Sequence, residues 1–257
     1  MIELSLQAQF SKAEAKPFTV QLSQDQSTED HACLVGEDDQ RQVYQFRDNI
    51  FAIQKPQRGS LIGDIVYAQP RGGFVSRWIR NDSMHNTLLI TERCDQLCIM
   101  CSQPPKKTHV DLFSHFEKAC RLAPDDMTIG LSGGEPLLYK EQVFQLIERT
   151  SDKRSDLKFH VLTNAQHFGD DDILRLRSPC FQSVLWGVPL YSHNKRVHDD
   201  IVAKPNAFDT LMKSFSIMAR AGLNIELRTV MLKQNYANLL ELSDLVAAKL
   251  PFLEVWA

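Results

Sequence analysis

The chain has 257 residues, 43% hydrophobic and 24% charged, which is the composition of an ordinary globular protein with one large domain or a small domain and a larger one. Its net charge of −3 argues against a nucleic-acid partner or a membrane-surface site. Because neither a secretion signal nor a run of roughly 18 apolar residues is present, we expect a cytoplasmic protein with no membrane span.

Residues 1–86 predict a small β-rich N-terminal domain. Short alternating or β-branched runs occupy residues 18–22, 43–53, 61–67 and 74–79, and turn-like clusters such as Gly36-Glu-Asp-Asp and Pro70-Arg-Gly-Gly separate them. Runs of this length, bounded by glycine, proline and aspartate, are typical of strands. The region shows no long helical period, and its sequence says little about what it binds.

The second domain, residues 87–257, predicts an α/β fold. Short apolar runs at 88–91, 127–131, 159–163, 183–188, 225–232 and 253–256 alternate with helical patterns at 109–122, 140–150, 170–177, 206–221 and 236–249. Such alternation implies parallel strands that are joined by right-handed crossovers. Six strands make a partial (β/α)6 barrel, and sites in such folds gather at the C-terminal ends of the strands.

Three of the six cysteines lie together at the end of the first strand, with the spacing Cys94-x-x-x-Cys98-x-x-Cys101. Clustered cysteines in a reducing cytosol indicate metal binding or catalysis rather than disulfides. A [4Fe–4S] cluster normally takes four thiolates, one for each iron, so three thiolates leave one iron open for catalysis. The competing interpretation is a structural zinc site with His109 as the fourth ligand. The other cysteines share no spacing pattern and are interpreted as small buried hydrophobic residues: Cys33, Cys120 and Cys180.

Polar or glycine-rich segments follow the later strands. The segment Gly133-Gly134-Glu135-Pro136 comes directly after the second strand, where glycines permit a sharp turn and a close approach of the backbone to a ligand. Taken alone, this segment also fits an ordinary turn that leads into a helix. Thr163-Asn164 ends the third strand and either donates hydrogen bonds to a ribose or a carboxylate or simply ends the strand. His193 and His198, after the fourth strand, are candidate proton donors, and loop or helix capping is the alternative.

The cysteine triplet at the end of a first strand, with Gly-Gly-Glu-Pro at the end of the next, resembles the radical S-adenosylmethionine (radical SAM) superfamily. The resemblance implies that Cys94, Cys98 and Cys101 ligate a [4Fe–4S] cluster whose open iron is chelated by the amino and carboxylate groups of S-adenosylmethionine. One electron then cleaves a carbon–sulfur bond and releases a 5′-deoxyadenosyl radical. The expected fold is therefore a partial radical SAM barrel preceded by the β-rich domain.

The resemblance also implies contacts with S-adenosylmethionine. The Gly133-Gly134-Glu135-Pro136 motif is expected to hold the amino group through backbone groups and the glutamate. Met100, the residue before the last cysteine, is expected to pack against the adenine, although that position is often aromatic in the family. Thr163-Asn164 is similar to a Thr-Asn pair often found at the third strand end, and Ser192 is similar to a serine that precedes a His-Asp pair.

Family members often carry a basic residue shortly after that His-Asp pair, where it meets the carboxylate of S-adenosylmethionine. Lys204 is the nearest candidate in this chain, and the lack of an arginine there departs from the family pattern. Arg228, within the fifth strand, is the other candidate, because an arginine is costly to bury without a partner. A carboxylate of the protein would serve as that partner equally well.

A longer string of residues is more distinctive than the triplet. Thr91-Glu-Arg-Cys and Cys98-Ile-Met-Cys-Ser-Gln-Pro-Pro, together with Ser83-Met-His-Asn and Pro189-Leu-Tyr-Ser-His, resemble the maturases of the His-Xaa-Ser peptide-modification system. The resemblance covers most of residues 75–257. It implies a ribosomally made peptide as substrate and a second radical SAM maturase as a possible partner.

Two other functions fit the same residues. One is a radical SAM enzyme that acts on a nucleoside or a small metabolite, and the other is a non-catalytic, metal-bearing scaffold for a partner maturase. Family members usually continue beyond the sixth strand, whereas this chain stops at Glu254-Val-Trp-Ala257. We therefore expect a truncated or naturally shortened chain, and an auxiliary cluster would lie in the part that is missing.

Overall fold

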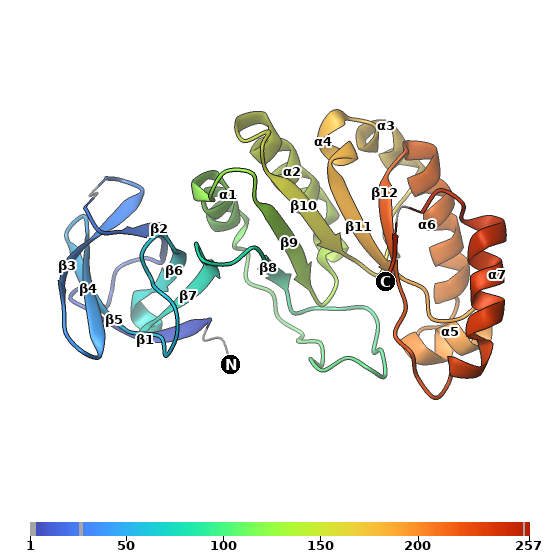
Figure 1. Cartoon of the computed structure of the whole chain (residues 1–257), viewed down its shortest axis with the longest axis horizontal. Helices are drawn as coiled ribbons and strands as arrows, with labels where there is room; N and C mark the ends of the chain where they lie inside the picture. Colours follow the sequence, from blue (N-terminus) through green and yellow to red (C-terminus); the bar gives the residue numbers. More distant parts are fainter. Residues whose placement is uncertain (1–3, 26–27, 254) are drawn as a thin grey trace. The chain divides into compact units, whose positions relative to one another are not determined.

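The computed structural model describes residues 4–25, 28–253 and 255–257. The chain folds into two compact units: one contains the residues up to 88 together with 112–129, and the other contains 89–111 together with 130–257 (Figure 1). A β-rich N-terminal region and a parallel sheet flanked by helices confirm the α/β fold class that the sequence predicted.

Within the described residues, seven strands close a barrel in the order β1-β5-β4-β3-β2-β6-β7. Their bounds are Ser5–Phe10 (β1), Phe18–Ser23 (β2), His31–Glu37 (β3), Arg41–Phe46 (β4), Asn49–Gln54 (β5), Ile65–Gln69 (β6) and Phe74–Ile79 (β7). The strand pairs are antiparallel except for β2 and β3, which run parallel. The predicted run 43–53 is a hairpin rather than one strand, because Arg47 adopts a left-handed conformation (φ 55°) between β4 and β5.

The barrel interior is mainly apolar, because alternate residues along each strand point inward. Its fully buried side chains include Val20, Leu22, Ala32, Tyr44, Phe51 and Ile53. A buried ion pair lies beside this core: Asp64 accepts hydrogen bonds from Arg77 Nε (2.6 Å) and from the backbone N–H of Asn81 (2.9 Å). Arg77 Nη2 also donates to the Ser60 carbonyl at 2.9 Å, so both members of the pair are satisfied.

Helix α1 (Phe113–Leu122) belongs to the first unit. The ring of Phe116 lies 4.7 Å from that of Trp78, and His115 Nδ1 lies 3.0 Å from Thr19 Oγ1. The apolar periodicity predicted this helix within 109–122, and the sequence pattern placed it in the domain 87–257. The apolar face of α1 packs against β2 and β6, an association that the spacing of apolar residues along one helix does not reveal.

The other sheet has the order β13-β12-β11-β10-β9-β8. Its strands are Asn86–Thr91 (β8), Thr128–Gly133 (β9), Lys158–Leu162 (β10), Val184–Pro189 (β11), Asn224–Arg228 (β12) and Val255–Trp256 (β13). The last predicted strand, 253–256, includes Glu254, which lies outside the described residues. The connecting helices are Lys140–Lys153 (α2), Ile173–Leu176 (α3), Pro179–Gln182 (α4), Lys195–Val202 (α5), Ala207–Ala221 (α6) and Leu239–Lys249 (α7). The pairs β10–β11, β11–β12 and β12–β13 are parallel, as predicted.

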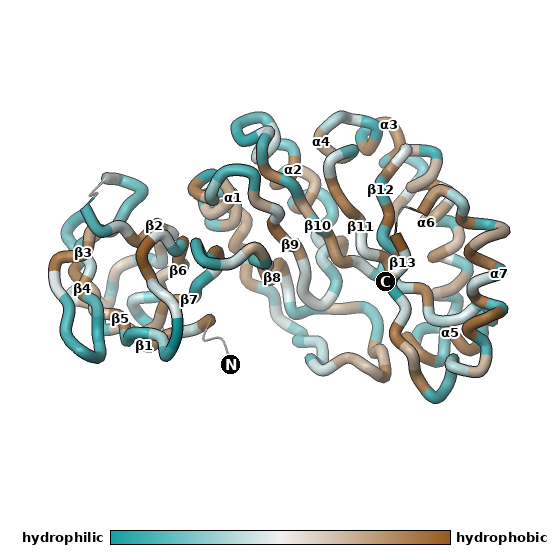
Figure 2. The backbone as a smooth tube through the Cα atoms, in the orientation of Figure 1, coloured by the Kyte–Doolittle hydropathy of each residue, from teal (hydrophilic) through white to brown (hydrophobic). Residues whose placement is uncertain are grey.

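The two faces of this sheet differ in character. On one face, Trp186 is fully buried with its ring 6.3 Å from that of Phe144 in α2. Hydrophobic residues recur along β9, β10 and β11 (Figure 2). Alternation places His160, Gly187 and Glu226 on the other face. No helix in the described part of the chain combines the length and the apolar character that crossing a membrane requires.

Candidate active site

The C-terminal ends of the sheet strands surround a cavity of about 570 Å³ in the second unit. The predicted site residues among its lining are Cys94, Cys98, Met100, Cys101, Gly133, Gly134, Thr163, Asn164 and Arg228. Lining residues that were not predicted as site residues include Gln96, Leu162, Gly187, Pro189, Tyr191 and Val230. Glu135, Pro136, Ser192, Lys204, His193 and His198 are not among the lining residues.

The three clustered cysteines are free thiols on one wall of this cavity. Burial, followed by the neighbouring Cys94 and Cys101, raises the pKa of Cys98 to about 11, and burial also raises the pKa of Cys94. Such thiols become thiolates near neutral pH only beside added positive charge, which bound iron supplies. The donor set therefore fits an iron–sulfur cluster.

The arrangement is less suited to a single metal ion. Among the described residues, no three His, Cys, Asp or Glu side chains converge on one ion position. Thiolates of a cluster bind different irons and stand farther apart than ligands of one ion. His109, the proposed fourth zinc ligand, instead stacks on the ring of Tyr139 at 3.8 Å and lies 3.2 Å from Thr91 Oγ1.

Backbone hydrogen bonds hold the cysteine loop against the end of α5. Leu97 N–H donates to the Val202 carbonyl (3.1 Å), and Ile99 N–H donates to the Ile201 carbonyl (3.0 Å). Between these residues and the last cysteine, Met100 packs against the buried cluster that contains Tyr191 and Ile201. The loop is thus anchored along one side while its cysteines face the cavity.

The glycines at the end of β9 allow the chain there to pass directly against the cysteine loop. A Cβ on Gly133 (φ 150°) would lie 2.1 Å from the Thr91 carbonyl oxygen, and one on Gly134 would lie 2.2 Å from that of Arg93. Gly134 N–H donates to Thr91 O and Glu135 N–H donates to Arg93 O, both at 2.8 Å. These two hydrogen bonds fix the glycine loop to the cysteine loop.

Glu135 is fully buried and links the ends of β9 and β10. Its carboxylate accepts hydrogen bonds from Leu137 N–H (2.7 Å), Thr163 Oγ1 (2.7 Å) and Asn164 N–H (2.5 Å). Burial raises the pKa of Glu135 to about 7, although these hydrogen bonds oppose the increase. The neighbouring Pro136 is buried at the first position of a 3₁₀ turn.

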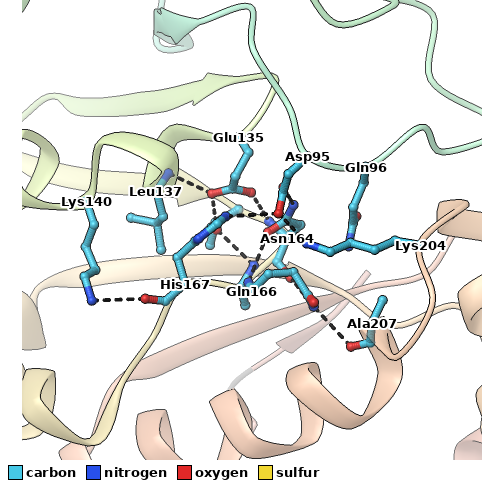
Figure 3. A network of polar contacts seen from close by, with 12 residues as sticks. Asp95, Gln96, Glu135, Leu137, Lys140, Asn164, Gln166, His167, Lys204 and Ala207 are labelled. Carbon is cyan, nitrogen blue, oxygen red and sulfur yellow. Dashed lines mark hydrogen bonds and ion pairs between the residues drawn. The ribbon is translucent and has the colours of Figure 1, made fainter.

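Asp95, inside the cysteine triplet, is the centre of a polar network (Figure 3). It accepts a hydrogen bond from Asn164 Nδ2 (2.8 Å), forms an ion pair with Lys204, and lies 3.3 Å from His167 Nε2. Burial alone would raise the pKa of Asp95, but the neighbouring His167, Lys204 and Asn164 side chains outweigh it and lower that pKa well below its usual value. Lys204, a candidate for the cofactor carboxylate, is therefore already paired with a protein carboxylate.

The histidines after β11 lie away from the cavity lining. His198 is buried, accepts a hydrogen bond from the Tyr191 N–H at Nδ1 (3.3 Å) and stacks on the Tyr191 ring. Burial lowers the pKa of His198 to about 4, so the ring is neutral at pH 7. His193 Nδ1 is buried and lacks a hydrogen-bond partner in the described structure. Ser192 Oγ accepts a hydrogen bond from Asn194 N–H at 3.0 Å, as a loop-capping residue does.

Arg228 at the end of β12 is the one basic side chain among the described residues that line the cavity. Its Nη1 lies 3.4 Å from Glu226 Oε2, and Glu226 also lies 2.7 Å from His160 Nε2. His160 on β10 reaches Glu226 on β12 directly over Gly187, where an added Cβ would lie within 3.2 Å of both side chains. The glycine therefore permits a contact across β11 that holds the partner of Arg228.

The sequence interpretation missed Asp95 and His167 as residues that shape the site. An aspartate between two clustered cysteines was a usable signal, because a charged residue in a ligand loop needs a partner when it is partly buried. His167 had no comparable signal, since it becomes relevant only when the segment after β10 folds against the cysteine loop.

The model of the family described as the radical SAM superfamily matches residues 88–246. Among solved structures, Streptococcus suis SuiB bound to precursor peptide SuiA is similar, with a TM-score of 0.54 and 17% identity over 65% of this chain and 37% of that one. Native anSMEcpe with bound AdoMet has a TM-score of 0.55 and 14% identity over 66% of this chain and 49% of that one.

At these identities the likeness concerns the fold alone, and the chain spans less than half of the length of these two structures. No curated protein matches the chain. The family match, however, covers more than half of the chain and includes both the cysteine loop and the Gly-Gly-Glu-Pro loop. The chain therefore belongs to the radical SAM superfamily, a group of enzymes that use an iron–sulfur cluster and S-adenosylmethionine.

Proposed function

We propose that this protein binds a [4Fe–4S] cluster through Cys94, Cys98 and Cys101, cleaves S-adenosylmethionine reductively and modifies a ribosomally made peptide. The observation that carries the proposal is the convergence on one cavity of three thiols, the Gly133-Gly134 backbone and a basic side chain, Arg228. Three thiolates leave one corner of the cluster open to the cofactor. When bound, the cluster and S-adenosylmethionine together supply a 5′-deoxyadenosyl radical after one-electron cleavage of the carbon–sulfur bond.

The residues of the cavity fit the polar groups of S-adenosylmethionine. Carbonyl oxygens of Gly133 and Gly134 would accept hydrogen bonds from its amino group, because an ammonium group is a donor and needs acceptors on the cavity wall. Arg228 would meet its carboxylate, since Lys204 is paired with Asp95. Glu135 would act indirectly, by joining the end of β9, which carries the two glycines, to the segment after β10.

Three further residues of the cavity lining are the candidates for contact with the nucleoside. Thr163 and Asn164 would offer the ribose the polar atoms that are not already donated to Glu135, and Met100 would offer an apolar surface to the adenine. Ser192 shapes the following loop through Asn194 rather than touching the cofactor. His193 would be the candidate proton donor, because His198 is buried and neutral.

A peptide is the substrate class that the available observations favour. SuiB, which shares the fold, was crystallised with its precursor peptide, and the Pro189-Leu-Tyr-Ser-His segment of this chain resembles maturases of the His-Xaa-Ser system. By that resemblance, a second radical SAM maturase would be the partner. The free cysteines fit a reducing compartment, so we place the protein in the cytoplasm.

Anaerobic reconstitution with iron and sulfide tests the proposal. The wild-type chain should take up about four irons and four sulfides and form 5′-deoxyadenosine after reduction with S-adenosylmethionine. Cys98→Ala should lose both properties, whereas Cys180→Ala, a change outside the cavity, should lose neither. A colourless protein that binds zinc tightly and leaves S-adenosylmethionine intact would instead support the scaffold function.

The substrate class needs its own comparison. A synthetic peptide with His-Xaa-Ser repeats should increase 5′-deoxyadenosine formation and change in mass, whereas a peptide of the same length with the histidines and serines replaced by alanine should do neither. Stimulation by nucleosides and not by the peptide would contradict the peptide assignment while leaving the radical SAM activity intact.

A further inference from the structure

We propose that Asp95 is a positioning residue that holds the cysteine loop in the geometry required to retain the cluster. The proposal rests on the proposed function, because it concerns the same three cysteines. Asp95 directly follows Cys94, yet the cavity lining does not include it. Figure 3 shows its carboxylate among side chains from the segment after β10 and from the turn after α5.

The carboxylate joins three parts of the chain that are distant in sequence. Asn164 Nδ2 donates to Oδ1 at 2.8 Å, His167 Nε2 lies 3.3 Å from Oδ2, and Lys204 forms an ion pair with Oδ2. Asp95 and Lys204 are both part-buried, with side-chain exposures of 23% and 30%. An ion pair that has a second hydrogen-bond donor, from Asn164, and limited water contact restrains the loop more than an exposed pair does.

These contacts act at one particular end of the cysteine loop. Leu97 and Ile99 are held by backbone hydrogen bonds to Val202 and Ile201, so the second half of the loop is anchored without any side chain. In the first half, Glu135 N–H holds the Arg93 carbonyl just before Cys94, and the Asp95 carboxylate is the side-chain anchor just after it. Loss of the carboxylate should therefore loosen the Asp95 side of Cys94 while Cys98 and Cys101 keep their anchored backbone.

The same network also reaches the loop expected to hold S-adenosylmethionine. Asn164 donates its side-chain amide to Asp95 and its backbone N–H to Glu135, at 2.8 and 2.5 Å. Residues that orient metal ligands through hydrogen bonds typically change metal affinity by 10- to 100-fold when they are removed. Asp95 acts one step further from the metal, because its carboxylate does not bond the Cys94 thiol but restrains the backbone next to it.

The test compares the release of cluster iron from reconstituted full-length variants to a chelator under anaerobic conditions. Asp95→Asn should release iron roughly tenfold faster than the wild type, and its reduced cluster should show an altered electron paramagnetic resonance spectrum. Lys204→Gln should increase the release rate in the same direction without any change next to a cysteine. The double variant should release iron little faster than Asp95→Asn, because both changes break the same ion pair.

A matched control separates positioning from general stability. Asp199 lies within α5, where its two carboxylate oxygens accept hydrogen bonds from the backbone N–H groups of Asn206 and Phe208 (both 2.8 Å), and neither bond involves the cysteine loop. Asp199→Asn should lower the thermal midpoint and leave the rate of iron release unchanged. The cluster spectrum of this variant should match that of the wild type.

The outcomes distinguish this proposal from the proposed function. A wild-type chain that takes up no iron and sulfide overturns both. A wild type that forms the cluster, beside Asp95→Asn and Lys204→Gln variants that release iron at the wild-type rate, overturns only the positioning role. If Asp95→Asn does not fold, Lys204→Gln decides the question by the same measurement.

Discussion

The two units treat buried charge in opposite ways. In the barrel, the Asp64 carboxylate lies against the Arg77 guanidinium, and both side chains are at most 2% exposed. Beside the cavity of the second unit, the fully buried Glu135 has three neutral donors, two backbone amides and a hydroxyl. Burial raises the pKa of both carboxyls, to about 7 for Glu135, but Asp64 lies beside a cation whereas Glu135 has only neutral donors within hydrogen-bond distance.

This difference indicates that the cost of burying a carboxylate is offset by a cation in the barrel but not beside the cavity. A buried ion pair with all its hydrogen bonds made is a structural feature, and it is sensitive to loss of either partner. Buried or half-buried groups with displaced pKa values that gather at a cavity are typical of functional sites, as Cys98 and Glu135 are here. The barrel should therefore respond to charge changes through stability, and the cavity should respond through ligand binding.

The largest effect on stability should come from the barrel. Arg77→Met leaves the Asp64 carboxylate buried without its cation and should lower the free energy of unfolding by about 3–5 kcal/mol. Urea unfolding measures this change. Arg71→Met is the control, because Arg71 is 76% exposed in its pair with Glu14 and should change stability by less than about 1 kcal/mol.

A second change sharpens the interpretation of that result. Asp64→Asn retains an oxygen acceptor for the Asn81 N–H while removing the charge. Combined with Arg77→Met, it should recover much of the lost stability, because no unpaired charge stays buried. A double variant as unstable as Arg77→Met alone would mean that packing, not charge, dominates at this position.

The sequence predicted the β/α half of the fold well because its strands are short apolar runs between helical periods. Val184–Pro189 and Lys158–Leu162 were found within two residues of their observed ends. Strand β1 (Ser5–Phe10) was missed, since its inward side chains include the small Ala8 and its outward ones are polar. Helix α5 (Lys195–Val202) was missed because only a short apolar stripe lies among its charged residues.

The site was predictable where its residues lie within a few positions of one another in the sequence. The spacing of Cys94, Cys98 and Cys101 identified the cavity wall on which they lie. The partners of Asp95 were not predictable, because Asn164 and Lys204 follow it by 69 and 109 residues and meet it only after the sheet has formed. The internal bonds of Glu135 likewise depend on the end of another strand, β10.

An intermediate effect on stability should appear as a pH dependence from His198. Its pKa is lowered from 6.5 to about 4, so protonation favours the unfolded state. Its contribution is therefore complete above about pH 6.5 and is lost as the pH falls towards 4, up to about 3 kcal/mol. His198→Asn removes the titrating ring and places a carbonyl oxygen near the position of Nδ1, which accepts the Tyr191 N–H.

The measurement is the free energy of unfolding of wild type minus variant at each pH between 4 and 8. Glu135 has the opposite slope, because its raised pKa gives stability that is complete below about pH 4.5 and is lost as the pH rises through about 7. That slope is common to both proteins and cancels in the difference. Parallel curves for wild type and variant would contradict a buried, neutral His198.

The smallest effect on stability should come from Arg228, although its effect on ligand binding should be large. Its side chain is 46% exposed and its contact with Glu226 is 3.4 Å long, so Arg228→Gln should change the free energy of unfolding by less than about 1 kcal/mol. The affinity for S-adenosylmethionine, measured by equilibrium binding to the reconstituted protein, should fall roughly tenfold because a charge-assisted hydrogen bond to the carboxylate is lost.

Arg220→Gln is the matched control, since Arg220 is also exposed but pairs with Asp170 away from the cavity. It should leave both stability and cofactor affinity unchanged. Unchanged affinity in Arg228→Gln would contradict the assignment of Arg228 to the cofactor carboxylate. It would also contradict the expectation that charge changes at the cavity alter ligand binding while those in the barrel alter stability. The expected combination, a neutral change in stability with a tenfold loss of binding, is the reverse of that for Arg77→Met: a charge without a close internal partner at a cavity matters mainly for its ligand.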